Sequence, residues 1–172
     1  ATIDPQSTPF RLVAGSAHPS LLHLTRPASE SGKGFKTVLS VDEVRRVGRF
    51  LALTAHDGGW RVVIVDPADD MNRAAANALL KNLEEPPSRT VFILIAHAPG
   101  SLLPTIRSRC QLVRFQPLAP NEVVEVLHRL QMQLPESESE RKTLAEQAGG
   151  SPRNGILLTQ YGGGEIGDAL AN

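Results

Sequence analysis

The chain has 172 residues, enough for one domain of ordinary size or for most of one domain plus a small second unit. Its 18 lysines and arginines balance 18 aspartates and glutamates, and this zero net charge argues against a broad basic surface that wraps nucleic acid. A single cysteine, Cys110, excludes an internal disulfide and a multi-cysteine zinc site.

The sequence carries no signal for a membrane or for export. No apolar run approaches the ~18 residues that a membrane-spanning helix needs, and residues 1–10 lack the charged and apolar regions of a signal peptide. The single cysteine fits a reducing compartment, so we expect a cytoplasmic protein without a membrane partner. Because the first residue is alanine and not methionine, we also expect a piece of a longer protein.

One strand and one helix are predicted in the first third of the chain. The apolar patch from Phe10 to Ala14 fits either the end of a helix or an irregular lead-in. Leu21–Leu24 has the composition of a short strand. Ser40 and Glu43 have the spacing of a capping box, in which each side chain bonds to the other's backbone N–H. Apolar residues then recur every three to four positions, which predicts a helix to about His56.

Apolar strands separated by a helix follow. Residues 62–65 are four consecutive β-branched residues, and residues 91–96 form a second apolar run. Between them, residues 72–85 are rich in alanine and leucine and stop at Pro86, which predicts a helix. A third, shorter strand is expected over residues 111–115. Strands that are apolar on both faces are typical of a parallel sheet with helices on each side.

The strand pattern ends near residue 118, and three helices are predicted after it. They cover residues 120–131, 137–148 and 151–161. The second begins at another capping box, formed by Ser137 and Glu140, and the third has Ser151 as its N-cap. We therefore expect an α/β domain over residues 1–117 and a helical domain over residues 118–172.

Asp66 lies at the end of the first buried strand, where open α/β sheets bind their ligands. In nucleoside triphosphatases an acid at this place holds Mg²⁺. A hydrolytic site also needs a second carboxylate to orient the attacking water, and the next residue, Pro67, cannot do this. Asp66 therefore fits either a degenerate nucleotide site or a plain strand end.

Two arginines, Arg107 and Arg109, flank a serine just before the third expected strand. A guanidinium carries rigid donors that can bind an anion through two hydrogen bonds at once. By composition alone, a solvated basic turn remains the plainer interpretation of this segment.

The order of these motifs resembles a known family. AANALLKNLEEPP (residues 75–87), the apolar strand after it and LLPTIRSRC (residues 102–110) are similar to the clamp-loader subunits of bacterial DNA polymerase III, a branch of the AAA+ proteins. Within that branch the chain most resembles the delta-prime subunits, because Pro67 stands where an ATP-hydrolysing subunit has glutamate. The resemblance runs from about Gly15 to Tyr161 and implies a partial AAA+ parallel sheet with flanking helices, followed by a three-helix lid.

The resemblance also implies roles for single residues. Ser108-Arg109-Cys110 matches the SRC motif, so Arg109 is the implied arginine finger that reaches the ATP site of a neighbouring subunit. Asp66 matches the Walker B acid, and Arg153 matches the sensor 2 arginine. No Walker A motif of the form G-x-x-x-x-G-K-[ST] occurs in the sequence, so ATP and Mg²⁺ are expected in the neighbouring subunit and not in this chain.

The function implied by the resemblance is that of a non-hydrolysing subunit of the DNA polymerase III holoenzyme, a DNA-directed DNA polymerase. It would complete a neighbour's ATPase site while the sliding clamp is placed on primed DNA in replication. The expected partners are the gamma/tau and delta subunits and, through the assembly, the clamp and the DNA. Two alternatives stay open: an ATP-hydrolysing gamma/tau subunit or related AAA+ ATPase whose phosphate loop lies upstream, and an adaptor without a role in trans.

Overall fold

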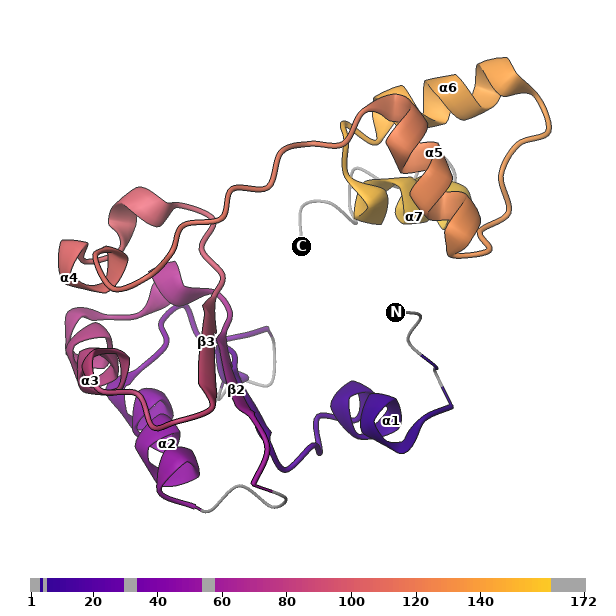
Figure 1. Ribbon diagram of the computed structural model, residues 1–172. Coiled ribbons are helices and arrows are strands. Elements are labelled where there is room, and N and C mark those ends of the chain that lie inside the picture. Colours follow the sequence, from indigo (N-terminus) through magenta and orange to yellow (C-terminus); the bar gives the residue numbers. More distant parts are fainter. Residues whose placement is uncertain (1–3, 5, 30–33, 54–57, 162–172) are drawn as a thin grey trace. The chain divides into compact units, whose positions relative to one another are not determined.

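Figure 1 shows the computed structural model of the chain, which describes residues 4, 6–29, 34–53 and 58–161. The chain forms two compact units, Ala1–Leu112 and Val113–Asn172. The first unit contains, in chain order, α1 (Thr8–Ala14), β1 (Leu21–Leu24), α2 (Val41–Ala52), β2 (Arg61–Val65), α3 (Arg73–Glu84), β3 (Thr90–Leu94) and α4 (Pro104–Arg107). The second unit contains α5 (Pro120–Arg129), α6 (Glu138–Gln147) and α7 (Pro152–Tyr161). No helix in the described part of the chain is long and apolar enough to cross a membrane.

The sheet of the first unit is parallel, with the strands in the order β1-β2-β3. In Figure 1, α2 and α3 lie on one side of the sheet. The side chains of Leu24, Val63 and Val65 are fully buried in a core that includes apolar residues of α2 and α3. On the opposite face, Val91 and Ile93 remain 39% and 44% exposed. The strands are therefore apolar on both faces, as predicted, but the described helices bury only one of these faces.

The predicted capping box at the start of α2 is wrong. Ser40 is the N-cap of this helix, but its side chain makes no capping hydrogen bond. The Glu43 carboxylate accepts instead from the Arg46 guanidinium, at 2.9 Å. An arginine three residues further along a helix lies close enough to compete for the carboxylate, and here that pair forms in place of the cap. The helix also ends at Ala52, earlier than expected, and residues 54–57 lie outside the described part of the chain.

The cap of α3 supports a first testable prediction. Asn72 accepts the backbone N–H of Ala75 at 2.8 Å and so satisfies one of the unpaired donors at the helix start. We expect Asn72→Ala to lower the free energy of unfolding of the first unit by about 1 kcal/mol, measured by urea denaturation. Ser40→Ala is the matched control, because its side chain makes no such bond. Equal losses for the two variants would contradict the role of the Asn72 side chain.

The strand expected over residues 111–115 is also wrong. None of these residues belongs to a strand, and the side chains of Leu112, Val113 and Phe115 are largely exposed. An extended segment becomes a strand only when its backbone pairs with another strand. Among the described residues, the sheet contains only β1, β2 and β3. The apolar pattern is thus present without the partner that would make it a strand.

The second unit has three described helices, within one or two residues of their predicted ranges. Val123 and Leu127 of α5 pack with Ala145 and Ala148 in a small core.

The predicted capping box at Ser137 is wrong, because the Ser137 side chain makes no capping hydrogen bond and lies against the Ser139 hydroxyl. The N-cap before α7 is confirmed, since the backbone N–H of Asn154 donates to the Ser151 hydroxyl at 3.3 Å.

Candidate functional site

Arg109 lies on the turn that follows α4, and α4 is only four residues long. A helix of this length has no stability of its own and depends on packing. Ile106, in the middle of this segment, is fully buried and anchors it to the first unit. The backbone N–H of Arg109 donates to the Ile106 carbonyl at 3.0 Å, which continues the turn. The position of Arg109 is therefore set by the burial of Ile106.

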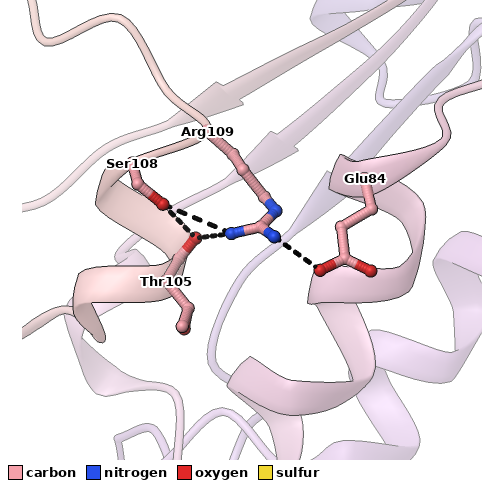
Figure 2. A network of polar contacts seen from close by, with 4 residues as sticks. All are labelled: Glu84, Thr105, Ser108 and Arg109. Atoms are coloured by element: carbon pink, nitrogen blue, oxygen red, sulfur yellow. Dashed lines mark hydrogen bonds and ion pairs between the residues drawn. The ribbon is translucent and has the colours of Figure 1, made fainter.

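The Arg109 guanidinium is held by two elements of its own unit, as Figure 2 shows. Its Nη1 donates to the Thr105 carbonyl at 2.9 Å and to the Ser108 hydroxyl at 3.3 Å. Its Nη2 lies 2.8 Å from Oε1 of Glu84, the last residue of α3 (Figure 2). The side chain nevertheless remains 36% exposed. Arg109 is thus bound within its own chain while part of its side chain stays accessible.

The other two residues of the SRC motif have local structural roles. The Ser108 hydroxyl donates to the Thr105 carbonyl at 3.1 Å and accepts from Arg109, so it supports the same turn. Cys110 is half-buried, and burial raises the pKa of its thiol. A raised pKa disfavours the thiolate form of Cys110.

Asp66 lies directly after β2, beside the end of β1. Its Oδ2 is 4.0 Å from Nε2 of His23 on β1, and both side chains are partly exposed. This contact follows from the parallel pairing of β1 with β2, because parallel strands end at the same edge of a sheet. No cluster of three or more His, Cys, Asp or Glu side chains that could hold a metal ion is found among the described residues. The metal-holding role implied for Asp66 stays a prediction.

Asp69, for which the sequence predicts no role in a site, joins the loop after β2 to the loop after β3. Its Oδ2 accepts the backbone N–H of Ala98 at 2.8 Å. Burial alone would raise the pKa of Asp69, but backbone N–H groups of Ala98, of Asp69 itself and of His97, with the charge of His97, hold the pKa below its usual value. The ionised Asp69 carboxylate therefore links the loops that follow β2 and β3, at the edge of the sheet where open α/β sheets bind their ligands.

Arg153 belongs to the second unit, in the first turn of α7. Its side chain is exposed, and the described residues provide it with no hydrogen-bond or ion-pair partner. In the first unit, the structure joins Arg109 to Glu84 and Asp66 to His23. Within the described residues no polar contact links these two pairs, so the predicted site residues do not form one cluster.

The family model and the similar proteins identify the same family of known proteins. A family model described as "DNA polymerase III, delta subunit" matches residues 3–119. DNA polymerase III subunit delta' of Pseudomonas aeruginosa is 46% identical over 100 residues, which are 58% of this chain and 29% of that protein. The Escherichia coli subunit delta' is 43% identical over 119 residues, 69% of this chain and 34% of that protein. The chain thus spans about a third of the length of these relatives.

Solved structures are similar in fold. A DNA polymerase III gamma subunit-related protein from Thermotoga maritima matches with a TM-score of 0.52 at 27% identity, over 81% of this chain and 46% of that chain. A RuvB mutant from the same organism matches with a TM-score of 0.57 at 16% identity, over 93% of this chain and 50% of that chain, and shows the fold alone. The predicted fold class, a partial AAA+ α/β sheet followed by helices, is confirmed. The chain belongs to the DNA polymerase III delta subunit family, as a homologue of delta' subunits.

Proposed function

We propose that this chain is part of a clamp-loader subunit that hydrolyses no ATP itself and supplies Arg109 to the ATP site of a neighbouring subunit. Family membership supports a place in the DNA polymerase III assembly. The observation that carries the role in trans is the position of Arg109, whose side chain is 36% exposed on a turn that the buried Ile106 anchors. The partners would be the gamma/tau and delta subunits and, through the assembly, the sliding clamp and primed DNA.

The acids near β2 support the absence of hydrolysis by this chain itself. A water-activating carboxylate is required beside the metal-holding acid, and Pro67 occupies that position. The two acids nearby are already engaged. Asp69 accepts the backbone N–H of Ala98, and the Asp70 carboxylate pairs with Arg26 at 3.3 Å. Both acids are also displaced along the chain from the position directly after Asp66, which Pro67 occupies.

The chemistry expected of Arg109 is stabilisation of charge. The neighbouring subunit would hold ATP and Mg²⁺, and negative charge develops on the phosphoryl group as it is transferred. A guanidinium offers fixed N–H donors whose geometry matches phosphate oxygens. Where the effect of such an arginine has been measured by itself, it raises kcat of phosphoryl transfer by roughly 10³- to 10⁵-fold.

A second candidate function is that of an ATP-hydrolysing gamma/tau subunit. It is favoured by the similarity to subunit tau of Bacillus subtilis, which is 31% identical over 132 residues, 76% of this chain and 23% of that protein. The two functions differ in nucleotide binding by the full-length protein. Hydrolysis of ATP by the full-length subunit alone would support the second candidate and overturn the first.

The test of the proposed function is the variant Arg109→Ala in the full-length subunit, reconstituted with its partner subunits. We expect ATP hydrolysis stimulated by the clamp and primed DNA to fall at least about tenfold, because the transition state loses its external cation. The measurement is the rate of phosphate release. Arg107→Ala is the matched control, since Arg107 is exposed on the same turn and makes none of the Arg109 contacts. Unchanged hydrolysis by Arg109→Ala would leave only an adaptor role.

A further inference from the structure

The ion pair between Glu84 and Arg109 joins two elements that are distant in the sequence. Glu84 is the last residue of α3, and Arg109 follows α4. A carboxylate in the last turn of a helix opposes the helix dipole, which favours positive charge at that end. Glu84 therefore does not stabilise α3 by its own charge. Its position is favourable because the Arg109 guanidinium lies 2.8 Å from it.

The contacts of the guanidinium come from two directions. Thr105 and Ser108, which belong to the same turn as Arg109, both accept from Nη1. Glu84 contacts Nη2 and belongs to a different helix (Figure 2). Contacts within one turn move together with that turn. Glu84 is therefore the contact that fixes the guanidinium relative to the sheet and α3.

One edge of the guanidinium is left for a ligand from outside. Within the described residues, Nε has no acceptor, and Nη2 has two hydrogens but only one partner, Glu84. Nε–H and Nη2–H together form an edge that can bind two oxygens of one phosphate. The Arg109 side chain as a whole is 36% exposed while it contacts Glu84, so solvent reaches part of it with that contact in place.

We propose that Glu84 is the positioning residue of Arg109, which holds the guanidinium with its free edge ready for the triphosphate of the neighbouring subunit. This inference rests on the proposed function of Arg109. An unrestrained arginine side chain samples many rotamers and loses that freedom when it binds. The ion pair with Glu84 restricts the side chain before the neighbour binds, so less freedom is lost in the transition state. Glu84 acts on the reaction only through Arg109.

The test uses Glu84→Gln in the full-length subunit, assembled with its partner subunits. Glutamine keeps the size of the side chain and removes its charge. We expect kcat for ATP hydrolysis to fall about two- to fivefold, the range that an exposed ion pair provides, with KM for ATP unchanged. Binding of ADP with aluminium fluoride, which mimics the transition state, should weaken by the same factor. Glu85→Gln is the control, because Glu85 is exposed beside Glu84 and the described residues give its carboxylate no ion pair.

A double-mutant cycle separates this inference from the proposed function. In the Arg109→Ala background, Glu84→Gln should produce no further loss of kcat. A further loss, or a rise of kcat in the single variant, would overturn the positioning role. If Arg109→Ala is impaired and Glu84→Gln hydrolyses ATP like the unaltered subunit, the inference alone fails. If Arg109→Ala is itself unimpaired, the proposed function fails and the inference with it. Melting temperature and assembly, checked for every variant, exclude a folding defect.

Discussion

Replacing Gly150 by alanine is expected to lower the free energy of unfolding of the helical unit by about 2–4 kcal/mol. Gly150 has a φ of +76°, in the left-handed region that side-chain-bearing residues disfavour. An added Cβ would also lie 2.5 Å from the Cβ of Pro117 and 2.8 Å from the backbone N and O of Leu118. These atoms belong to a rigid ring and to the main chain, so they cannot rotate away. The whole segment that enters the helical unit would have to shift.

This close approach is accompanied by a hydrogen bond between the same two segments. The backbone N–H of Leu118 donates to the Gly150 carbonyl at 3.0 Å, which ties the entering segment to the turn before α7. Arg153, the implied sensor arginine, lies in the first turn of that helix. A shift of the contact between Leu118 and Gly150 would therefore displace the start of α7, and Arg153 with it. The two effects of Gly150→Ala, on stability and on the place of Arg153, have one cause.

The adjacent glycine provides the matched control for this prediction. Gly149 has a φ of +58°, but an added Cβ would meet no atom within 4 Å. Gly149→Ala should therefore cost only the conformational strain, about 1 kcal/mol. Urea denaturation of both variants, followed by the helical signal, measures the difference. Equal losses would show that the approach of residues 117 and 118 to Gly150 contributes nothing.

Local sequence signals were sufficient where the structure depends on neighbouring residues. The helix predicted over residues 72–85 is α3, because an N-cap at Asn72 and a proline stop at Pro86 mark both of its ends. The strand predicted over residues 21–24 is β1. The patch from Phe10 to Ala14, which fits either the end of a helix or an irregular lead-in, belongs to the helix α1. The two helices follow from residues within their own segments, whereas β1 also needs its pairing with β2.

Signals that depend on distant partners were insufficient. Residues 111–115 have the composition of a strand, but a strand also needs a neighbour whose backbone pairs with it, and no described strand does so. The capping boxes at Ser40 and Ser137 failed for a different reason, because nearby side chains compete for the same groups. Each depends on one rotamer, which other contacts such as the pair of Glu43 with Arg46 can displace.

The candidate site shows the same division. Arg109 was identified from a motif of consecutive residues, and the structure places it on an anchored turn. Its partner Glu84 could not be identified, because their contact depends on how the turn of α4 lies against the end of α3. The tie between Asp69 and Ala98 likewise joins two loops that follow different strands. Sequence spacing points to the candidate residue, whereas the packing of helices and loops determines what holds it.

Ile106→Ala is the second variant with a large expected effect. Ile106 is fully buried, and truncation of such a side chain costs about 2–5 kcal/mol. Because α4 has only four residues, it can detach without unfolding of the sheet, so the loss is expected mainly as local opening. Hydrogen exchange should accelerate more than tenfold at the amides of Arg107 and Arg109, which bond to the carbonyls of Leu103 and Ile106.

The consequence for function follows from the same anchor. If α4 detaches, Arg109 loses its contact with Glu84, and the turn that carries its contact with Thr105 no longer has a fixed position relative to the sheet. ATP hydrolysis by the assembly should then fall nearly as far as with Arg109→Ala, although Arg109 is intact. Ile93→Ala is the control, because Ile93 is 44% exposed on β3 and makes no part of the turn. Rapid exchange at Arg109 with undiminished hydrolysis would contradict the requirement for an anchored arginine, since a loose side chain would then serve equally well.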